Sequence, residues 1–168
     1  PTENRVVQHN LMDDHDSQEF LARFSGTEQV TGFAVIGGRF SEGIDLVGDR
    51  LIGAIIVGTG LPRINSERDF IKDYYQEGGA GFEMAYQLPG MNRILQTAGR
   101  VIRGEKDKGL ICLVDPRFTE RRYRQLMPDH WPVDVVSTTA ALQSAMSRFW
   151  SKVEQDGSMA VPSGEIQG

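Results

Sequence analysis

Residues 52–57 read Ile-Gly-Ala-Ile-Ile-Val, and residues 110–114 read Leu-Ile-Cys-Leu-Val. Two shorter apolar runs precede them, at Val6-Val7 and from Phe33 to Ile36. None of the four runs alternates apolar with polar residues. Continuous runs of this kind are typical of strands in a parallel sheet that is buried on both faces. The sequence therefore predicts an α/β fold with a mainly parallel sheet flanked by helices.

Two segments with helical spacing and a start signal lie outside these runs. The first begins at Asp16, where Glu19 supports a capping box, and the second begins at Ser66, with Asp69 three residues on. Gly78-Gly79 breaks the second helix. The side chains that the two helices are expected to bury are Phe20, Leu21 and Phe24 in the first, and Phe70, Ile71, Tyr74 and Tyr75 in the second.

The third predicted helix is the best defined. It opens at Pro89-Gly90, runs to Arg103 and ends at Gly104, and a short helix through Phe82 and Tyr86 precedes it. A further helix starts at Thr138 or Thr139. The apolar stripes of these two long helices are Met91, Ile94, Leu95, Ala98, Val101 and Ile102, and Leu142, Ala145, Met146, Phe149, Trp150 and Val153.

The chain has 168 residues, 39% of them hydrophobic and 24% charged, which is typical of one globular domain. We expect this domain to cover residues 1–154 and a flexible tail to follow at 155–168. The net charge is −5, yet residues 93–124 hold nine basic and four acidic residues. This local excess mildly favours an anionic ligand.

Several other classes of function find no support in the sequence. No apolar run has the length of a membrane helix, and residues 1–4 lack the features of a signal peptide, so we predict a cytoplasmic protein. The single cysteine, Cys112, lies in an apolar run and is expected in the core. His9, His15 and His130 show no ligand spacing, so we predict no metal site.

Three polar residues share one face of the helix predicted for residues 91–103. Gln96, Arg100 and Arg103 are spaced i, i+4 and i+7, opposite the apolar stripe. Two guanidinium groups on a rigid helix suit a phosphate group, and Gly99 would let a ligand or another backbone come close. A solvated basic face explains the spacing equally well.

A glycine-rich segment, residues 37–45, follows the strand predicted for residues 33–36. It contains three glycines, a serine and two carboxylates. Parallel α/β sheets bind ligands at the carboxyl ends of their strands, so the segment has the form of a binding loop. The alternative is a glycine-rich turn with Glu42 and Asp45 in water.

These segments together resemble motifs of superfamily 2 helicases. Residues 38–45, Gly-Arg-Phe-Ser-Glu-Gly-Ile-Asp, resemble motif V, and residues 96–103, Gln-Thr-Ala-Gly-Arg-Val-Ile-Arg, resemble motif VI. The form Ser-Glu-Gly-Ile-Asp points to the XPD/DinG branch. Residues 61–62, 82–89, 115–118 and 128–131 also resemble that branch, so the likeness covers about residues 5–136. It implies a RecA-like three-layer sandwich that serves as the second motor lobe of an ATP-dependent DNA helicase.

The resemblance implies roles in ATP hydrolysis for the third helix. Arg100 and Arg103 would reach the γ-phosphate of an ATP molecule held by the first lobe, with Arg103 as the arginine finger. Gln96 would help to align the nucleotide and the attacking water. The remaining nucleotide-binding residues would be Glu42, Gly43, Asp45 and Gly99.

It also implies a track for single-stranded DNA, along which the family moves 5′ to 3′. Ser41 and Arg39 would hold a DNA phosphate. Arg121 and Arg122 are candidates for following the DNA backbone, although an exposed arginine-rich helix is the plainer explanation for them.

The family features that are missing from this chain belong to the first lobe. They are the phosphate loop, the Mg²⁺ motif and the four cysteines of an iron–sulfur cluster. The family's second lobe also begins with one more strand and helix, so we expect a fragment of a longer protein. We expect it to be monomeric, to pair with the first lobe of its parent chain, and to show no ATP turnover alone.

Three other interpretations compete with a motor lobe. Gly58-Thr59-Gly60 could open a dinucleotide fingerprint, but Pro62 stands where that motif continues and no acidic ribose ligand follows. A lobe attached to an exonuclease and a non-catalytic DNA-binding scaffold both remain open. The sequence upstream in the parent chain would separate them from a motor.

Overall fold

The computed structural model describes residues 4–26, 28–41, 46, 50–104 and 107–158. These residues belong to two compact units, 1–128 and 129–168. A single lobe over residues 1–154 therefore stays a prediction. No helix among the described residues has the length and apolar character needed to cross a membrane.

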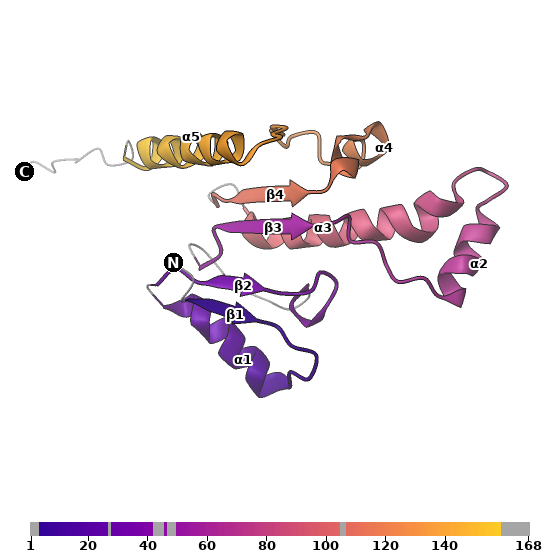
Figure 1. Ribbon diagram of the computed structural model, residues 1–168, viewed down its shortest axis with the longest axis horizontal. Coiled ribbons are helices and arrows are strands. Elements are labelled where there is room, and N and C mark those ends of the chain that lie inside the picture. Colours follow the sequence, from indigo (N-terminus) through magenta and orange to yellow (C-terminus); the bar gives the residue numbers. More distant parts are fainter. Residues whose placement is uncertain (1–3, 27, 42–45, 47–49, 105–106, 159–168) are drawn as a thin grey trace, which may run out of the picture. The chain divides into compact units, whose positions relative to one another are not determined.

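Four strands in the first unit form two parallel pairs. Strand β1 (Arg5–Val7) pairs with β2 (Thr31–Phe33), and β3 (Gly53–Val57) pairs with β4 (Leu110–Val114). Their arrows point the same way in Figure 1, so the carboxyl ends of all four lie toward the same side of the unit. The predicted α/β class with parallel strands is confirmed.

Strand β2 ends earlier than predicted. The apolar run predicted a strand over Phe33 to Ile36, but pairing stops at Phe33 because β1 ends at Val7. Gln8 follows β1, and its backbone amide donates to the carbonyl of Phe33 (2.8 Å) while its side chain accepts from the amide of Val35 (2.9 Å). The amide of Gly38 then donates to the carbonyl of Val35 (3.0 Å), which closes a turn.

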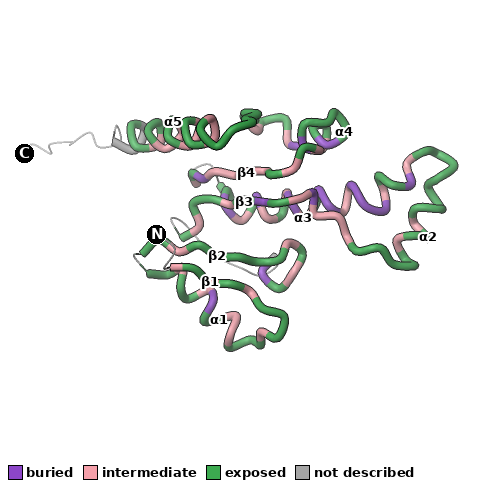
Figure 2. The backbone as a smooth tube through the Cα atoms, in the orientation of Figure 1, coloured by how far each residue is buried: buried purple, intermediate pink, exposed green. Residues whose placement is uncertain are grey.

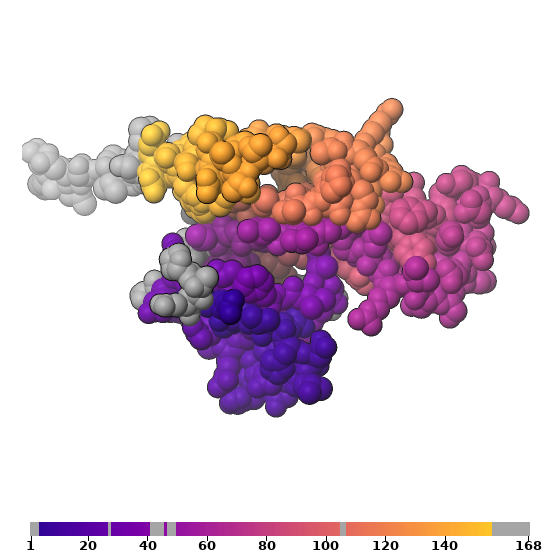
Figure 3. All heavy atoms as spheres, in the orientation of Figure 1, coloured from indigo at the N-terminus to yellow at the C-terminus, as the bar shows by residue number. Residues whose placement is uncertain are grey.

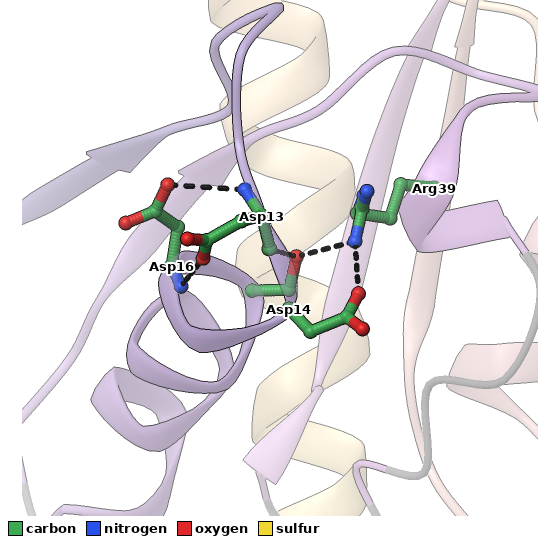
Figure 4. A network of polar contacts seen from close by, with 5 residues as sticks. Asp13, Asp14, Asp16 and Arg39 are labelled. Carbon is green, nitrogen blue, oxygen red and sulfur yellow. Dashed lines mark hydrogen bonds and ion pairs between the residues drawn. The ribbon is translucent and has the colours of Figure 1, made fainter.

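Helix α1 (Asp14–Ala22) begins before the predicted Asp16. Its capping box joins Asp13 to Asp16 rather than Asp16 to Glu19: the Asp13 carboxylate accepts from the amide of Asp16 (2.9 Å), and the Asp16 carboxylate accepts from the amide of Asp13 (3.1 Å; Figure 4). A single turn of 3₁₀ helix, η1 (Arg23–Ser25), follows. Phe20 is buried, as predicted, and stacks on Phe40 with ring centres 4.3 Å apart.

Helix α2 (Ser66–Tyr74) starts where predicted but is rotated relative to the expected orientation. Phe70 and Tyr74 were expected in the core, yet they are 72% and 71% exposed. The helix forms part of the magenta-to-pink surface at the right of Figure 3. Polar contacts set its rotation, because Arg68 donates to the carbonyl of Ala85 (3.4 Å) and Asp69 accepts from the hydroxyl of Tyr86 (3.3 Å).

A turn of π-helix, η4 (Glu83–Gln87), leads directly into α3 (Leu88–Val101). The predicted apolar stripe of α3 is confirmed for Met91, Ile94, Ala98 and Val101, whose side chains are buried. Buried positions along α3 are purple in Figure 2. The helix ends earlier than the predicted Arg103. Ile102 already has an extended backbone (φ −124°, ψ 105°) and its side chain is 42% exposed.

Helix α3 packs on β3 and β4. Ile56 of β3 is 5% exposed, whereas its neighbours Ile55 and Val57 are 70% and 74% exposed. Neighbouring side chains of a strand point to opposite faces, so one face of β3 is covered and the other is open among the described residues. Burial of both faces, expected from the apolar run, is not observed for this strand.

The remaining elements are short, except for the last helix. In the first unit these are the 3₁₀ turns η2 (Arg39–Ser41) and η5 (Pro116–Thr119) and the helix α4 (Arg121–Arg124). The second unit contains α5 (Thr139–Ser158), where Thr138 accepts from the amide of Ala141 (3.2 Å). The start of α5 agrees with the prediction, but the helix continues past Gln155, where the tail was expected to begin.

Candidate functional site

Gln96 and Arg100 lie one turn apart on α3, as the spacing predicted. Gln96 is exposed and Arg100 is half-buried. Arg103 is exposed and lies beyond the end of the helix, so its predicted i+7 position on the same helix face is wrong. It nevertheless stays beside Arg100, because its Nε donates to the Arg100 carbonyl (3.3 Å).

The turn after α3 is held by Asp107, which was not among the predicted site residues. One oxygen of its carboxylate accepts from the backbone amides of Arg103 (2.9 Å) and Gly104 (3.0 Å). The Asp107 amide donates to the carbonyl of Gly104 (3.1 Å). An aspartate that bonds nearby backbone groups is ordinary turn chemistry, so the segment from Gly104 to Asp107 did contain a signal for it.

Gly99 lies on the exposed side of α3. A Cβ atom added there would meet no atom of the described residues within 4 Å. Packing against the described residues therefore does not require a glycine at position 99. The open space is consistent with the predicted approach of a ligand or another backbone.

The glycine-rich segment of residues 37–45, called the glycine loop below, is only partly described. Glu42, Gly43 and Asp45, predicted to bind nucleotide, lie outside the described residues, and Ser41 is described only as the last backbone position of η2. The start of the loop is defined by Gly37, whose φ of 74° is in the left-handed region that favours glycine.

Arg39 carries a charge that is already paired within the first unit. Its Nη1 lies 2.6 Å from Oδ1 of Asp14 and 3.4 Å from the hydroxyl of Ser17, both on α1 (Figure 4). The Asp14 side chain is 97% exposed, so this ion pair is screened by solvent and contributes little to stability. Arg39 can therefore exchange Asp14 for another anion at low cost.

Arg93 on α3 is a second residue that was not among the predicted site residues. It is half-buried and lies against two loops, those that follow β2 and β3. Its Nη1 donates to the carbonyl of Gly60 (3.3 Å), and its guanidinium packs on Gly37. Only the fold reveals this role, because both contacts join residues that are more than thirty positions apart.

Arg121 and Arg122 are exposed on α4. Nε of Arg122 lies 2.7 Å from the Glu120 carboxylate, and its guanidinium carbon lies 5.5 Å from the centre of the Tyr123 ring. The buried side chain of Gln87 donates to the carbonyl of Arg122 (2.8 Å), which fixes α4 to the start of α3. The two arginines thus lie on an anchored helix.

The neighbouring pair of Asp115 and Arg117 is held by two side-chain bonds of 2.9 and 2.7 Å. The hydrogen bonds from Arg117 lower the pKa of the Asp115 carboxyl, and the same bonds raise the pKa of the Arg117 guanidinium. The pair stabilises the segment between β4 and α4. Helix α4, which follows this segment, carries Arg121 and Arg122.

One group of possible metal ligands occurs among the described residues. Ligand atoms of Asp13, His15 and Asp16 lie within 4.8 Å of one another. The Asp13 and Asp16 carboxylates form the capping box of α1, and the hydrogen bond from the Asp16 amide is the largest cause that lowers the pKa of Asp13. Capping accounts for the cluster, and the predicted lack of a metal site stays a prediction.

Comparison with known proteins shows the domain family to which the chain belongs. Residues 2–134 match the family described as the helicase C-terminal domain. Similar curated proteins include a probable ATP-dependent helicase of Methanocaldococcus jannaschii, 29% identical over 70% of this chain and 19% of that protein. The ATP-dependent DNA helicase DinG of Photobacterium profundum is 35% identical over 56% of this chain and 14% of that protein.

The chain is also similar to the XPD helicase subunit of the general transcription and DNA repair factor IIH of Dictyostelium discoideum, with 32% identity over 56% of this chain and 12% of that protein. It thus spans about a fifth or less of these relatives. A solved XPD helicase structure shares the fold, with a TM-score of 0.58 and 22% identity over 75% of this chain and 23% of that one. The chain belongs to the helicase C-terminal domain family, as the C-terminal lobe of an XPD/DinG-type helicase.

Proposed function

We propose that the chain is the C-terminal motor lobe of an ATP-dependent 5′–3′ DNA helicase and that Arg100 and Arg103 contact ATP bound by the first lobe. The observation that carries this proposal is the turn after α3. Asp107 accepts from the backbone amide of Arg103, and Arg103 donates to the carbonyl of Arg100, so both guanidinium groups belong to neighbouring residues at the C-terminal end of α3. The names of the relatives as ATP-dependent helicases support the same reaction.

Two adjacent guanidinium groups suit the charge that develops on a transferring phosphoryl group. Arg103 is exposed, which lets it reach a nucleotide outside this chain, while half-buried Arg100 is more constrained. Gln96, one turn before Arg100, would orient the nucleotide and the attacking water. Gly99 would leave room for the nucleotide or the first lobe to approach this face of α3. Glu42, Gly43 and Asp45 complete the proposed nucleotide site.

Movement would follow from a two-state mechanism. ATP that contacts both lobes favours their closure, and hydrolysis removes that difference in affinity. Single-stranded DNA would lie along the glycine loop at Arg39 and Ser41 and along α4 at Arg121 and Arg122. Each cycle of closure and opening would then move the strand by a step.

The other cofactors of such a motor belong in the first lobe under this proposal. Mg²⁺ would be held there with the β- and γ-phosphates. An iron–sulfur cluster of the four-cysteine type does not fit this chain, whose single cysteine, Cys112, is a half-buried residue of β4. We propose that the lobe acts within a monomeric, cytoplasmic parent protein.

The test is ATP turnover by the two-lobed parent polypeptide. We expect Arg103→Ala to lower turnover by about 10³- to 10⁵-fold while nucleotide binding by the first lobe persists. Arg63→Ala, at an exposed arginine remote in sequence from motif VI, is the control and should keep the wild-type rate.

The 168-residue chain alone should not turn over ATP. Turnover by this chain, or a wild-type rate in Arg103→Ala, would contradict the proposal. A parent sequence with an acidic exonuclease pattern, or with no phosphate loop and no Mg²⁺ motif, would favour the nuclease-linked or the scaffold interpretation instead.

A further inference from the structure

We propose that Arg93 is a positioning residue that couples the glycine loop to α3, so that DNA bound at the loop changes the ATP turnover supported by Arg100 and Arg103. The inference rests on the proposed function and deepens it, because it names a residue that transmits one ligand's effect to the other. Arg93 itself need contact neither ligand.

The first contact is with Gly37, at the start of the glycine loop. A Cβ atom built on Gly37 would lie 2.9 Å from Nε, 3.0 Å from Cδ and 3.1 Å from Cζ of Arg93. Real Cβ atoms almost never approach so closely, so the guanidinium is packed directly on the Gly37 backbone. The φ of 74° at Gly37 independently favours a glycine, so both the backbone conformation and the packing of Arg93 suit a residue without a side chain.

The second contact is with the loop that follows β3. Nη1 of Arg93 donates to the carbonyl of Gly60 (3.3 Å). Gly60 also has a positive φ, 64°, and packs closely on the backbone of α3, because an added Cβ would lie 2.9 Å from the carbonyl oxygen of Gly90. A single guanidinium thus joins the loops at the carboxyl ends of two parallel strands, where ligands of α/β proteins bind.

The place of Arg93 on α3 connects these loops to the proposed nucleotide contacts. Arg93 lies three residues before Gln96 and seven before Arg100, on the same side of a continuous helix. A shift of the glycine loop therefore acts on the helix that carries both residues. A rigid helix with loops packed on it is a suitable route for such coupling.

The chemistry of the side chain explains why an arginine is used here. Its Nε, Cδ and Cζ atoms lie against Gly37, while Nη1 donates to the carbonyl of Gly60. A lysine keeps the positive charge but has a single ammonium group, which cannot make both contacts. Arg93→Lys therefore separates the geometric role from the charge, and Arg93→Gln removes both.

The first measurement is hydrogen exchange of the 168-residue chain. Arg93→Gln should raise the exchange of backbone amides in residues 37–41, while the amides of β4 keep their protection. Gly37→Ala should also raise amide exchange in residues 37–41, because it disturbs the contact with Arg93 at Gly37. In the double variant with Arg93→Gln and Gly37→Ala, amide exchange should rise by less than the product of the two single increases. The reason is that the new methyl group at position 37 no longer clashes with Arg93.

The second measurement is the factor by which single-stranded DNA stimulates ATP turnover of the two-lobed protein. Arg93→Lys and Arg93→Gln should lower this factor by about threefold to thirtyfold. Turnover without DNA should stay within about twofold of wild type, and Arg63→Gln should change neither value. A purely structural role would lower both rates together and leave their ratio unchanged.

Unchanged exchange at residues 37–41 overturns the inference, and so does an unchanged stimulation factor. A wild-type protein whose turnover is not stimulated by DNA overturns it as well. If the proposed function is wrong, Arg103→Ala will show full ATP turnover. The hydrogen-exchange measurement on Arg93 does not depend on that result.

Discussion

Asp107 holds the backbone of Arg103: its carboxylate accepts the Arg103 amide at 2.9 Å and the Gly104 amide at 3.0 Å. Because Arg103 lies beyond the last residue of α3, helix geometry does not hold its backbone, and the Asp107 carboxylate does. We expect Asp107→Ala to lower ATP turnover of the two-lobed protein by about tenfold to a hundredfold, since small misplacements of a catalytic group have effects of that size.

Two variants make this prediction specific. Asp107→Asn keeps an oxygen that can accept both amides, so it should retain most of the turnover. Asp73→Ala, at an exposed aspartate of α2, should have no effect. Equal turnover in Asp107→Ala and wild type would show that the turn does not position Arg103.

The ion pair of Asp115 and Arg117 predicts a pH dependence of stability. Hydrogen bonds from Arg117 lower the pKa of Asp115 below its ordinary value of 3.8. The carboxylate therefore stabilises the folded state above that value, and its contribution is lost as the pH falls through the lowered pKa.

Asp115→Asn removes the charge but keeps an oxygen for the amide of Arg117. At pH 7 it should lower the free energy of unfolding by up to about 1 kcal/mol, because Arg117 is partly exposed. Urea unfolding of both proteins from pH 7 to pH 2 should show this difference shrinking below about pH 4. A difference that stays constant over the range would contradict the assignment.

Tyr123 gives a test of the core beneath α4. Its side chain is completely buried, and no hydrogen-bond partner for its hydroxyl occurs among the described residues. Tyr123→Phe should therefore leave the free energy of unfolding unchanged or raise it by about 1 kcal/mol, since a buried hydroxyl without a partner is unfavourable. Tyr123→Ala should lower it by about 3–5 kcal/mol because it leaves a cavity. A clear loss of stability in Tyr123→Phe would show that a water or a partner satisfies the hydroxyl.

Apolar spacing predicted much of this fold. The buried side chains of Met91, Ile94, Ala98 and Val101 recur every three or four positions over about three turns of α3. Strands β3 and β4 were predicted to within one residue, because long apolar runs are distinctive. Local spacing on one element was sufficient in both cases.

The rotation of α2 was missed because it depends on contacts distant in sequence. Arg68 and Asp69 each bond to a residue 17 positions away, and these bonds turn Phe70 and Tyr74 outward. In the candidate site, too, contacts between residues distant in sequence could not be predicted. The position of Gln96 one turn before Arg100 follows from helix geometry, whereas the contact of Arg93 with Gly37 exists only once the loop after β2 lies against α3.

Salt dependence tests the proposed DNA-binding role of α4. Arg121→Glu and Arg122→Glu in the two-lobed protein should flatten the plot of log binding constant against log salt concentration by about 0.7 for each DNA phosphate that the variant no longer neutralises. Arg63→Glu makes the same charge change outside the proposed track and serves as the control. An unchanged slope would remove Arg121 and Arg122 from the interface.

Substitution of Gly99 should affect stability and nucleotide binding in opposite directions. It lies inside α3, and an added Cβ would meet no described atom within 4 Å. Gly99→Ala should therefore raise the free energy of unfolding of the 168-residue chain by about 0.5–1 kcal/mol, since alanine favours the helix. If nucleotide or the first lobe approaches this face, the same methyl group should raise the KM for ATP in the two-lobed protein. A more stable variant with an unchanged KM for ATP would place Gly99 outside the nucleotide site.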